Sequence, residues 1–195
     1  MTALSEFIEN LQDLLQVPVE LGDEALDVAN ILRQRLPMDV KQIHSTGISE
    51  ATPCPIPTAL SWFADEIPNL PRALQTVSQN LVVLKDSLPW YTRPEPDYPE
   101  FMQAHANAQV IGPKGLLVRD DMMVGVSLVN AHTTYPDHWH PPAEIYLVLT
   151  PGLWRQNEDD WHEPGVGGYV YNPPNIVHAM QAQQSPLFAI WCLPL

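Results

Sequence analysis

The hydrophobic side chains in the first half of the chain recur at the spacing of amphipathic helices. In residues 3–16, large apolar side chains return every three or four positions, so they share one face of a helix. Three more segments, which begin near Asp23, Thr58 and Asn69, have the same spacing, and a proline follows each of the first two helices. We therefore expect four helices here, with residues 41–57 as a loop between the second and the third.

Helix ends and buried faces follow from the same pattern. Asp23 and Asn69 are residue types that accept hydrogen bonds from the first free amides of a helix, and we expect each to be an N-cap. Pro71, near the start of the fourth helix, suits a first turn because its missing amide hydrogen is not needed there. The residues of the second helix expected to face the interior are Leu26, Ala29, Ile31 and Leu32.

The pattern changes in the second half of the chain. Residues 89–99 contain four prolines, which prevent regular structure, so we expect a linker or a segment that packs over the mouth of the next unit. A short helix is expected near residues 100–106. From Ala108 onward, short apolar runs alternate with turn residues and indicate about eight strands, as in a small closed barrel or jelly roll. The predicted fold is mainly β, with a barrel over residues 108–195 and a helical segment over residues 1–107 packed outside it.

Composition narrows the class of protein. The 195 residues are 45% hydrophobic, enough for one domain with a substantial core. The net charge of −14 argues against nucleic acids and anionic membrane surfaces as partners, and it weakly favours a substrate with a cationic group. The sequence begins without the basic region of a signal peptide and has no apolar run long enough to span a bilayer, so we expect a cytoplasmic protein. Cys54 and Cys192 do not indicate a disulfide framework.

Residues 133–154 contain several side chains that bind metals. Alternate residues of a strand share a face, so His138 and His140 can point the same way, and so can Glu144 and Tyr146. Two prolines between these pairs are expected to form a turn, because proline does not suit a strand ladder. Two imidazoles, a carboxylate and a phenol would then converge on one point.

A later strand is expected to bring His178 to the same point and to complete a site for one divalent metal ion. Nitrogen and oxygen ligands without a thiolate suit iron, manganese, nickel, cobalt or zinc. Such a ligand set leaves open positions at the metal, as in a catalytic site. The Tyr146 phenol is expected to act there as a ligand, as a general base, or as both in turn. Tyr135 is expected in the loop that enters the site.

These two stretches resemble the paired motifs of the cupin family. The first motif, His-x-His followed by Glu and later by Gly, is represented by His138, His140, Glu144 and Gly152. The second is represented by Gly167, Pro173, Asn175 and His178. Asn175 replaces the usual glycine, and asparagine is the next best residue type for a left-handed turn. The resemblance implies a cupin barrel over roughly the last ninety residues.

A closer resemblance is to the cupin-type dimethylsulfoniopropionate (DMSP) lyases. It is carried by Tyr135, just before the His-x-His, and by Tyr146, two residues after the Glu. It implies a helical segment before the barrel, a homodimer, and one metal ion with Tyr146 beside it. The ligand set that it implies is His138, His140, Glu144 and His178.

The resemblance also implies a reaction. A base removes the proton alpha to the DMSP carboxylate, dimethyl sulfide leaves the β-carbon, and acrylate remains. A metal that binds the carboxylate would make this proton more acidic, and aromatic faces would hold the sulfonium group. We expect Tyr146 to be the base, with Tyr135 as the alternative. The same ligands also serve cupin dioxygenases and cupins that bind a small molecule without catalysis, so both alternatives stay open.

Overall fold

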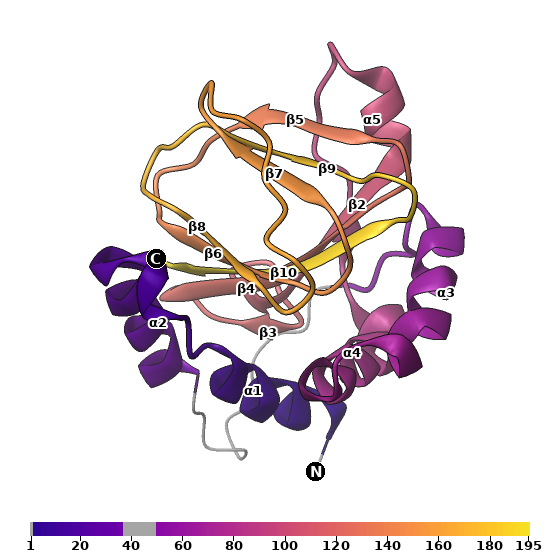
Figure 1. Ribbon diagram of the computed structural model, residues 1–195. Coiled ribbons are helices and arrows are strands. Elements are labelled where there is room, and N and C mark those ends of the chain that lie inside the picture. The colour runs from indigo at the N-terminus through magenta and orange to yellow at the C-terminus, as the bar shows by residue number, and fades with distance from the viewer. Residues whose placement is uncertain (1, 37–49) are drawn as a thin grey trace.

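The helices and the strands form two parts that lie against each other. The computed structural model describes residues 2–36 and 50–195. Its strands form a barrel, and four of its helices lie in an arc along one side of that barrel (Figure 1). Most of the loop expected over residues 41–57 lies outside the described residues. The helical layer covers the outside of the barrel, as the sequence predicted.

The helices of the arc lie close to their predicted places. They are α1 (Ala3–Leu14), α2 (Asp23–Arg35), α3 (Pro57–Glu66) and α4 (Arg72–Leu84). The 3₁₀ turns beside them are η1 (Val19–Leu21), η2 (Ile67–Asn69) and η3 (Lys85–Ser87). Helical periodicity was therefore a sufficient guide to where these elements occur.

Both predicted N-caps were wrong. Gly22 is the N-cap of α2, and Asp23 is the first helical residue. Asn69 is the last residue of η2, and α4 begins only at Arg72, with Pro71 as its N-cap. The Asn69 amide donates to the carboxylate of Glu66 at 3.3 Å instead of capping a helix.

The buried face of α2 is narrower than predicted. Ala25, Ala29 and Leu32 are buried, at positions that follow one stripe of the helix. Ile31 was expected to face inward, but its side chain is 39% exposed. Each residue turns a helix by about 100°, which places Ile31 about 100° from Leu32 and about 160° from Ala29, outside the stripe of buried residues.

Within the described residues, ten strands form two sheets that face each other across the barrel. The larger sheet has the order β1-β2-β4-β10-β6-β8, with β3 paired to β2, and the smaller has the order β5-β9-β7 (Figure 1). The strands of the larger sheet are β1 (Trp90–Tyr91), β2 (His105–Gly112), β3 (Leu117–Val118), β4 (Met122–Val129), β6 (Glu144–Val148), β8 (Tyr169–Asn172) and β10 (Leu187–Pro194). Those of the smaller sheet are β5 (Thr134–His138), β7 (Leu153–Gln156) and β9 (His178–Gln181).

Regular structure reaches further toward the N-terminus than the strand pattern indicated. Residues 89–99 were expected to lack it, but the two residues after Pro89 form β1, which pairs with β2. Helix α5 (Pro99–Ala104) then leads directly into β2, which begins at His105 rather than at Ala108. The prolines permit this because β1 is a short edge strand.

Strand β10 separates two hydrophobic cores. Its side chains that pack with the helices are Phe188, Ile190 and Cys192, and those that pack in the barrel interior are Ala189, Trp191 and Leu193. Phe63 of α3 stacks on Phe188, with ring centroids 4.0 Å apart. Because both faces of β10 are buried, its sequence is a nearly continuous apolar run. The interior-facing set is the one that reaches the functional site.

Candidate metal centre and active-site cavity

The predicted metal ligands come from three strands and one turn. His138 ends β5, Glu144 begins β6, and His140 lies in the turn between them. His178 begins β9 and is the cross-strand partner of His138. The two prolines after His140 lie in the bend that the sequence predicted. The barrel thus brings the two motifs together.

The side chains of His140, Glu144 and His178 converge, so that the Nε2 atoms of both imidazoles lie near one carboxylate oxygen. Oε2 of Glu144 lies 3.3 Å from Nε2 of His140 and 3.3 Å from Nε2 of His178. The Nδ1 atoms of these two imidazoles lie 2.9 Å from the carbonyl oxygen of Pro142 and 3.0 Å from that of Ile176. A carbonyl can only accept, so each Nδ1 carries a hydrogen, and in its neutral form each ring presents the lone pair of Nε2 toward the carboxylate.

This arrangement fits a metal cation. The ligand atoms of His140, Glu144 and His178 all lie within 4.8 Å of one another. Both Nε2 atoms are buried, and neither has a hydrogen-bond partner in the part of the chain that the structure describes. Two nitrogen lone pairs and a carboxylate that share one point are stabilised by a cation between them, and this ligand set suits a divalent first-row ion.

Neighbouring side chains hold Glu144 as an oriented carboxylate. Burial alone would raise the pKa of Glu144, but hydrogen bonds and positive charge from the protonated forms of His140 and His178 hold that pKa below its usual range. Nδ2 of Asn172 donates to Oε2 of Glu144 at 2.9 Å, and Nε2 of Gln156 donates to Oδ1 of Asn172 at 2.8 Å. Such outer hydrogen bonds fix the direction in which a ligand carboxylate points.

His138 lies beside this group of three. Its ring centroid is 4.1 Å from that of His178, and its Nδ1 lies 2.9 Å from the carbonyl oxygen of Pro136. Burial and the nearby His178 lower the pKa of His138 to about 3, so the ring is neutral near pH 7, as a metal ligand must be. Its place as a fourth ligand stays a prediction.

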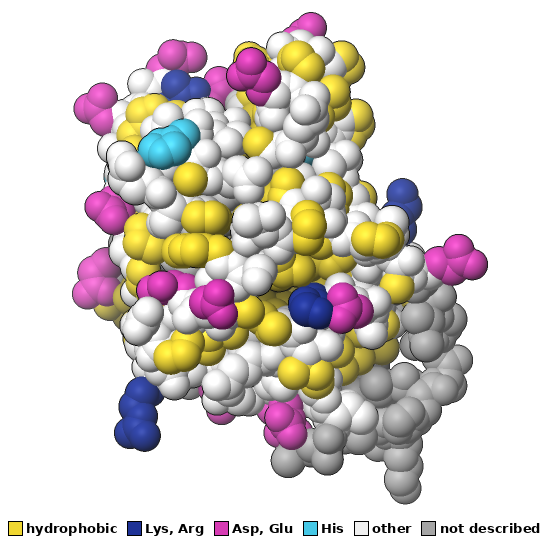
Figure 2. Space-filling model, turned by 90° about the vertical axis from the view of Figure 1, so that its right-hand side faces the viewer, with side chains coloured by type: hydrophobic (Ala, Val, Ile, Leu, Met, Phe, Trp, Pro, Cys, Tyr) yellow, Lys and Arg dark blue, Asp and Glu magenta, His cyan; other side chains and the backbone are white. Residues whose placement is uncertain are grey.

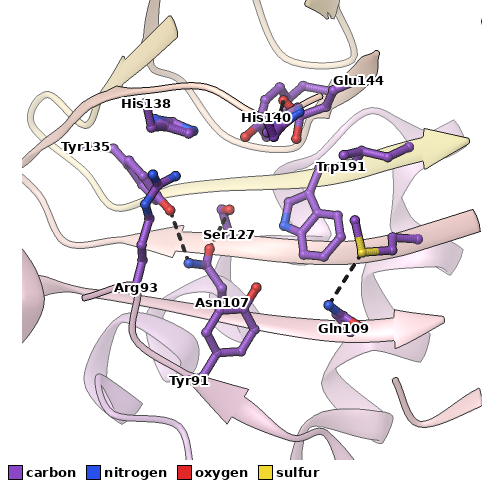
Figure 3. Close-up of a pocket in the computed structure, with 13 residues that line it drawn as sticks. Tyr91, Arg93, Asn107, Gln109, Ser127, Tyr135, His138, His140, Glu144 and Trp191 are labelled. Atoms are coloured by element: carbon purple, nitrogen blue, oxygen red, sulfur yellow. Dashed lines mark hydrogen bonds and ion pairs between the residues drawn. The ribbon is translucent and has the colours of Figure 1, made fainter. Parts of the chain in front are cut away.

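A cavity of about 310 Å³ opens beside the cluster. Figure 3 shows the Arg93 guanidinium beside the Tyr135 ring on one side of this cavity and the Trp191 indole on another. The lining residues are Tyr91, Arg93, Asn107, Gln109, Met123, Ser127, Tyr135, His138, His140, Glu144, Tyr146, Trp191 and Leu193. Both predicted catalytic tyrosines and three of the four predicted ligands are in this set.

Tyr146 faces the negative side of the cavity. It follows Glu144 by two residues along β6, so the two side chains share a face of the strand. Burial, together with the negative charge of Glu144, raises the pKa of Tyr146 well above its usual value. A positive charge at the neighbouring cluster would act in the opposite direction.

Tyr135 faces hydrogen-bond donors. It lies in β5 and is buried, whereas the sequence placed it in a loop. Its hydroxyl accepts a hydrogen bond from Nδ2 of Asn107 at 3.3 Å, and Oγ of Ser127 donates to Oδ1 of Asn107 at 2.6 Å, which orients the amide. Burial raises the pKa of Tyr135, whereas the Arg93 guanidinium and the Asn107 amide act against that rise.

The Trp191 indole fits in the barrel because its cross-strand partner is a glycine. Trp191 of β10 pairs with Gly125 of β4. A Cβ atom on Gly125 would lie 2.1 Å from Cζ2 of Trp191 and 2.3 Å from the carbonyl oxygen of Ala108. Gly125 therefore leaves the space in which an aromatic face can line the cavity.

Four polar lining residues were missed at the sequence level, namely Arg93, Asn107, Gln109 and Ser127. A signal existed for Asn107 and Ser127, because a polar residue inside an apolar strand needs a partner when it is buried. Arg93 was overlooked within the proline-rich segment, although it is the only lysine or arginine between Lys85 and Lys114.

The small barrel with its helical layer has the cupin fold that the sequence predicted. The family model described as dimethylsulfoniopropionate lyase matches residues 39–189, and the chain belongs to this family. The chain is 27% identical to a putative dimethylsulfoniopropionate lyase, DddL, from Cereibacter sphaeroides over 106 residues, which are 54% of this chain and 45% of the relative. It is 31% identical to the dimethylsulfoniopropionate lyase DddQ from Ruegeria pomeroyi over 94 residues, which are 47% of this chain and 46% of the relative. The matches thus span about half the length of these curated relatives.

Solved structures share the fold over nearly the whole chain. A structure described as that of the DMSP lyases RdDddP and RnDddQII superposes with a TM-score of 0.71 at 16% identity, and covers 99% of this chain and 92% of that one. The structure of the DMSP lyase DddQ from Ruegeria pomeroyi gives a TM-score of 0.68 at 19% identity. The superposition covers 99% of this chain and 91% of that one. None of the helices within the described ranges is long and apolar enough to cross a membrane.

Proposed function

We propose that this protein cleaves DMSP to dimethyl sulfide and acrylate by a metal-dependent β-elimination. Membership of the DMSP lyase family supports the substrate. The observation that carries the proposal is the cluster of His140, Glu144 and His178, whose electron pairs face one another at a cavity that two tyrosines also line. The cluster fits a Lewis acid, and the tyrosines are candidate bases.

The metal would be held by the residues that the two motifs supply. His140, Glu144 and His178, with His138 as the fourth ligand, would bind one ion of iron, zinc, manganese, nickel or cobalt. When bound, such an ion polarises the oxygen atoms of a substrate as a Lewis acid. The backbone carbonyls that accept from the Nδ1 atoms keep the imidazoles in the tautomer that binding requires.

The protein itself would supply the base. The proton alpha to the carboxylate passes to a phenolate oxygen, and the electron pair of the broken C–H bond forms the Cα–Cβ double bond. The Cβ–S bond breaks as this double bond forms, and its electron pair leaves with dimethyl sulfide. We assign the base to Tyr146, with Tyr135 as the alternative. The sulfonium has no hydrogen to donate, so an aromatic face such as that of Trp191 is its natural contact.

The first test measures product and metal together. Metal-reconstituted protein incubated with DMSP should release dimethyl sulfide into the headspace, with acrylate in equal amount. His178→Ala should lose both the bound metal and the activity while it keeps its far-ultraviolet circular dichroism spectrum, because one ligand is gone. His162→Ala is the matched control, since this exposed imidazole lies outside the cavity lining, and it should retain both.

The contrary results point to other assignments. If none of the five metals supports dimethyl sulfide release, DMSP is not the substrate. Oxygen consumption with an aromatic or thiol substrate would indicate a dioxygenase, and release of an unchanged ligand would indicate a binding protein. Unchanged metal content in His178→Ala, measured by elemental analysis, would remove His178 from the ligand set. A homodimer and a cytoplasmic location stay predictions.

A further inference from the structure

We propose that Arg93 binds the carboxylate of the substrate and so makes the cavity specific for carboxylate-bearing substrates. This inference rests on the proposed function for the identity of the substrate. Its basis is the position of one guanidinium group in a cavity whose other walls are aromatic, apolar or neutral polar, apart from the His and Glu cluster.

The backbone at Arg93 is held in place. Its amide donates to Nε2 of His105 at 2.8 Å, and Nδ1 of His105 lies 2.7 Å from the carbonyl oxygen of Phe101. His105 is fully buried and stacks on the Phe101 ring, with centroids 3.7 Å apart. Pro94 further restricts the backbone of Arg93 to extended conformations. The proline-rich segment therefore presents Arg93 from a fixed point at the cavity wall.

The Arg93 guanidinium has more hydrogen-bond donors than its contact with Glu95 uses. Nε of Arg93 donates to the Glu95 carboxylate at 2.8 Å, and the side chain remains 33% exposed. A guanidinium carries five N–H donors, so the terminal nitrogens stay available for a second carboxylate in the paired geometry that arginine favours. In Figure 3 the group lies toward Tyr135, across the cavity from His140 and Glu144.

The charges along the cavity match a zwitterion in one orientation. Among the described residues that line it, Arg93 is the only lysine or arginine, and Glu144 is the only acid. The Trp191 indole lies apart from Arg93 in the same cavity (Figure 3). A substrate with its carboxylate at Arg93 can place a sulfonium group toward the indole face. Each carboxylate oxygen keeps a second lone pair that can face the ligand cluster.

The kinetic experiment compares DMSP with its carboxamide, which has the same size but no negative charge. Arg93→Met should raise KM for DMSP by about 10- to 100-fold, because a charge-assisted hydrogen-bond pair is lost. The much lower activity on the carboxamide should change less than about 3-fold, within the usual scatter of a neutral contact. Arg93→Lys should lie between, since it keeps the charge and loses the paired geometry.

Two controls separate this role from others. Arg72→Met removes one positive charge from an exposed position at the start of α4, and it should leave the preference for DMSP over the carboxamide unchanged. If Arg93→Met or Arg93→Lys changes the activity on DMSP and on the carboxamide by the same factor, Arg93 does not recognise the carboxylate. If Arg93→Met does not fold, Arg93→Lys decides between these outcomes.

A binding experiment works without turnover. β-Alanine betaine carries a trimethylammonium in place of the dimethylsulfonium and cannot release dimethyl sulfide. Calorimetry on the metal-free protein should show that this probe binds wild type at least about 10-fold more tightly than Arg93→Met. Equal binding would overturn the role of Arg93. A preserved difference in a protein that does not cleave DMSP would keep the role and reject only the proposed function.

Discussion

The two cavity tyrosines are both buried, but they meet opposite charges. Tyr146 shares a strand face with the Glu144 carboxylate, which disfavours a phenolate. Tyr135 lies near the Arg93 guanidinium and accepts a hydrogen bond from Asn107, and both contacts favour a phenolate. A base at Tyr146 therefore depends on the positive charge of a bound metal, whereas at Tyr135 the Arg93 guanidinium and the Asn107 amide offset part of the pKa rise that burial causes.

Substitution of each tyrosine by phenylalanine distinguishes the two assignments. Tyr146→Phe should lower kcat by about 10²- to 10⁴-fold, the usual contribution of a general base. Its metal content should not change if the phenol is a base and not a required ligand. Tyr135→Phe should mainly raise KM, because the hydroxyl would then help to hold the substrate.

The contrary pattern reverses the assignment. If Tyr135→Phe abolishes turnover and Tyr146→Phe keeps a nearly normal kcat, Tyr135 is the base. If both variants stay active on DMSP, neither phenol takes the proton. Metal content measured on each preparation, with single-turnover rates, separates loss of the metal from loss of the base.

The residues predictable from sequence were those whose chemistry repeats at a strand spacing. His138 and His140 form one alternating pair and Glu144 and Tyr146 form another, so a shared face was expected within each pair. Arg93 and Asn107 lie far away in sequence and carry no such spacing. Only the pairing of β1, β2 and β4 brings them to the cavity.

At the scale of elements, Phe63 of α3 and Phe188 of β10 form one of the contacts between the helical layer and the barrel. The rings of Phe63 and Phe188 are both buried and lie parallel, at an interplanar angle of 6°. Phe188 belongs to the face of β10 opposite to Trp191, which lines the cavity. The strand that packs against Phe63 therefore also carries a side chain of the cavity.

Phe63→Ala should reduce the free energy of unfolding by about 3–5 kcal/mol, because it removes a fully buried ring and leaves a cavity in the core. Urea unfolding followed by circular dichroism measures this. Val83→Ala on α4 is the control, since Val83 is 68% exposed and its loss should cost less than about 0.5 kcal/mol. Equal stabilities of the two variants would mean that the ring contact contributes little.

Element types were predictable here, but element ends were not. The apolar periods of α1 and α4 and the short runs of the strands identified helices and strands correctly. The N-caps failed because a cap depends on where the preceding 3₁₀ turn ends, as at Asn69. Strand β1 was missed because two residues have no period, and only pairing with β2 makes them a strand.

At the scale of the whole molecule, the helical layer and the barrel share one core. The core that contains Phe7, Leu32 and Phe63 also contains Val126 and Ile190 of the sheet. The apolar helix faces predicted that these helices need a partner, but no pattern in the sequence says which face of the sheet they cover. That choice depends on which strand residues point away from the cavity.

A polar cluster ties α2, the start of β4 and the C-terminus together. The Arg35 guanidinium donates to the backbone carbonyls of Asp121 and Leu195, and Nη1 of Arg119 donates to the carbonyl of Arg35 at 2.6 Å. Nε of Arg119 donates to the Asp121 carboxylate at 2.8 Å. The hydrogen bond from Arg119 outweighs the effect of burial and lowers the pKa of Asp121.

The lowered pKa of Asp121 predicts a pH-dependent stability. A carboxylate with a folded pKa below its unfolded value of about 3.9 stabilises the fold above that value, and the stabilisation is lost as the pH falls through the folded pKa. Because Asp121 is 39% exposed, solvent screening limits this stabilisation to at most about 1 kcal/mol.

Asp121→Asn should therefore melt a few degrees below wild type near pH 7, and the difference should shrink below about pH 3.5 and in high salt. Asp120→Asn removes the same charge from the adjacent exposed position and should melt as wild type does across the range. Thermal melts that show the same deficit for Asp121→Asn at every pH would attribute the loss to packing and reject the ion pair as its cause.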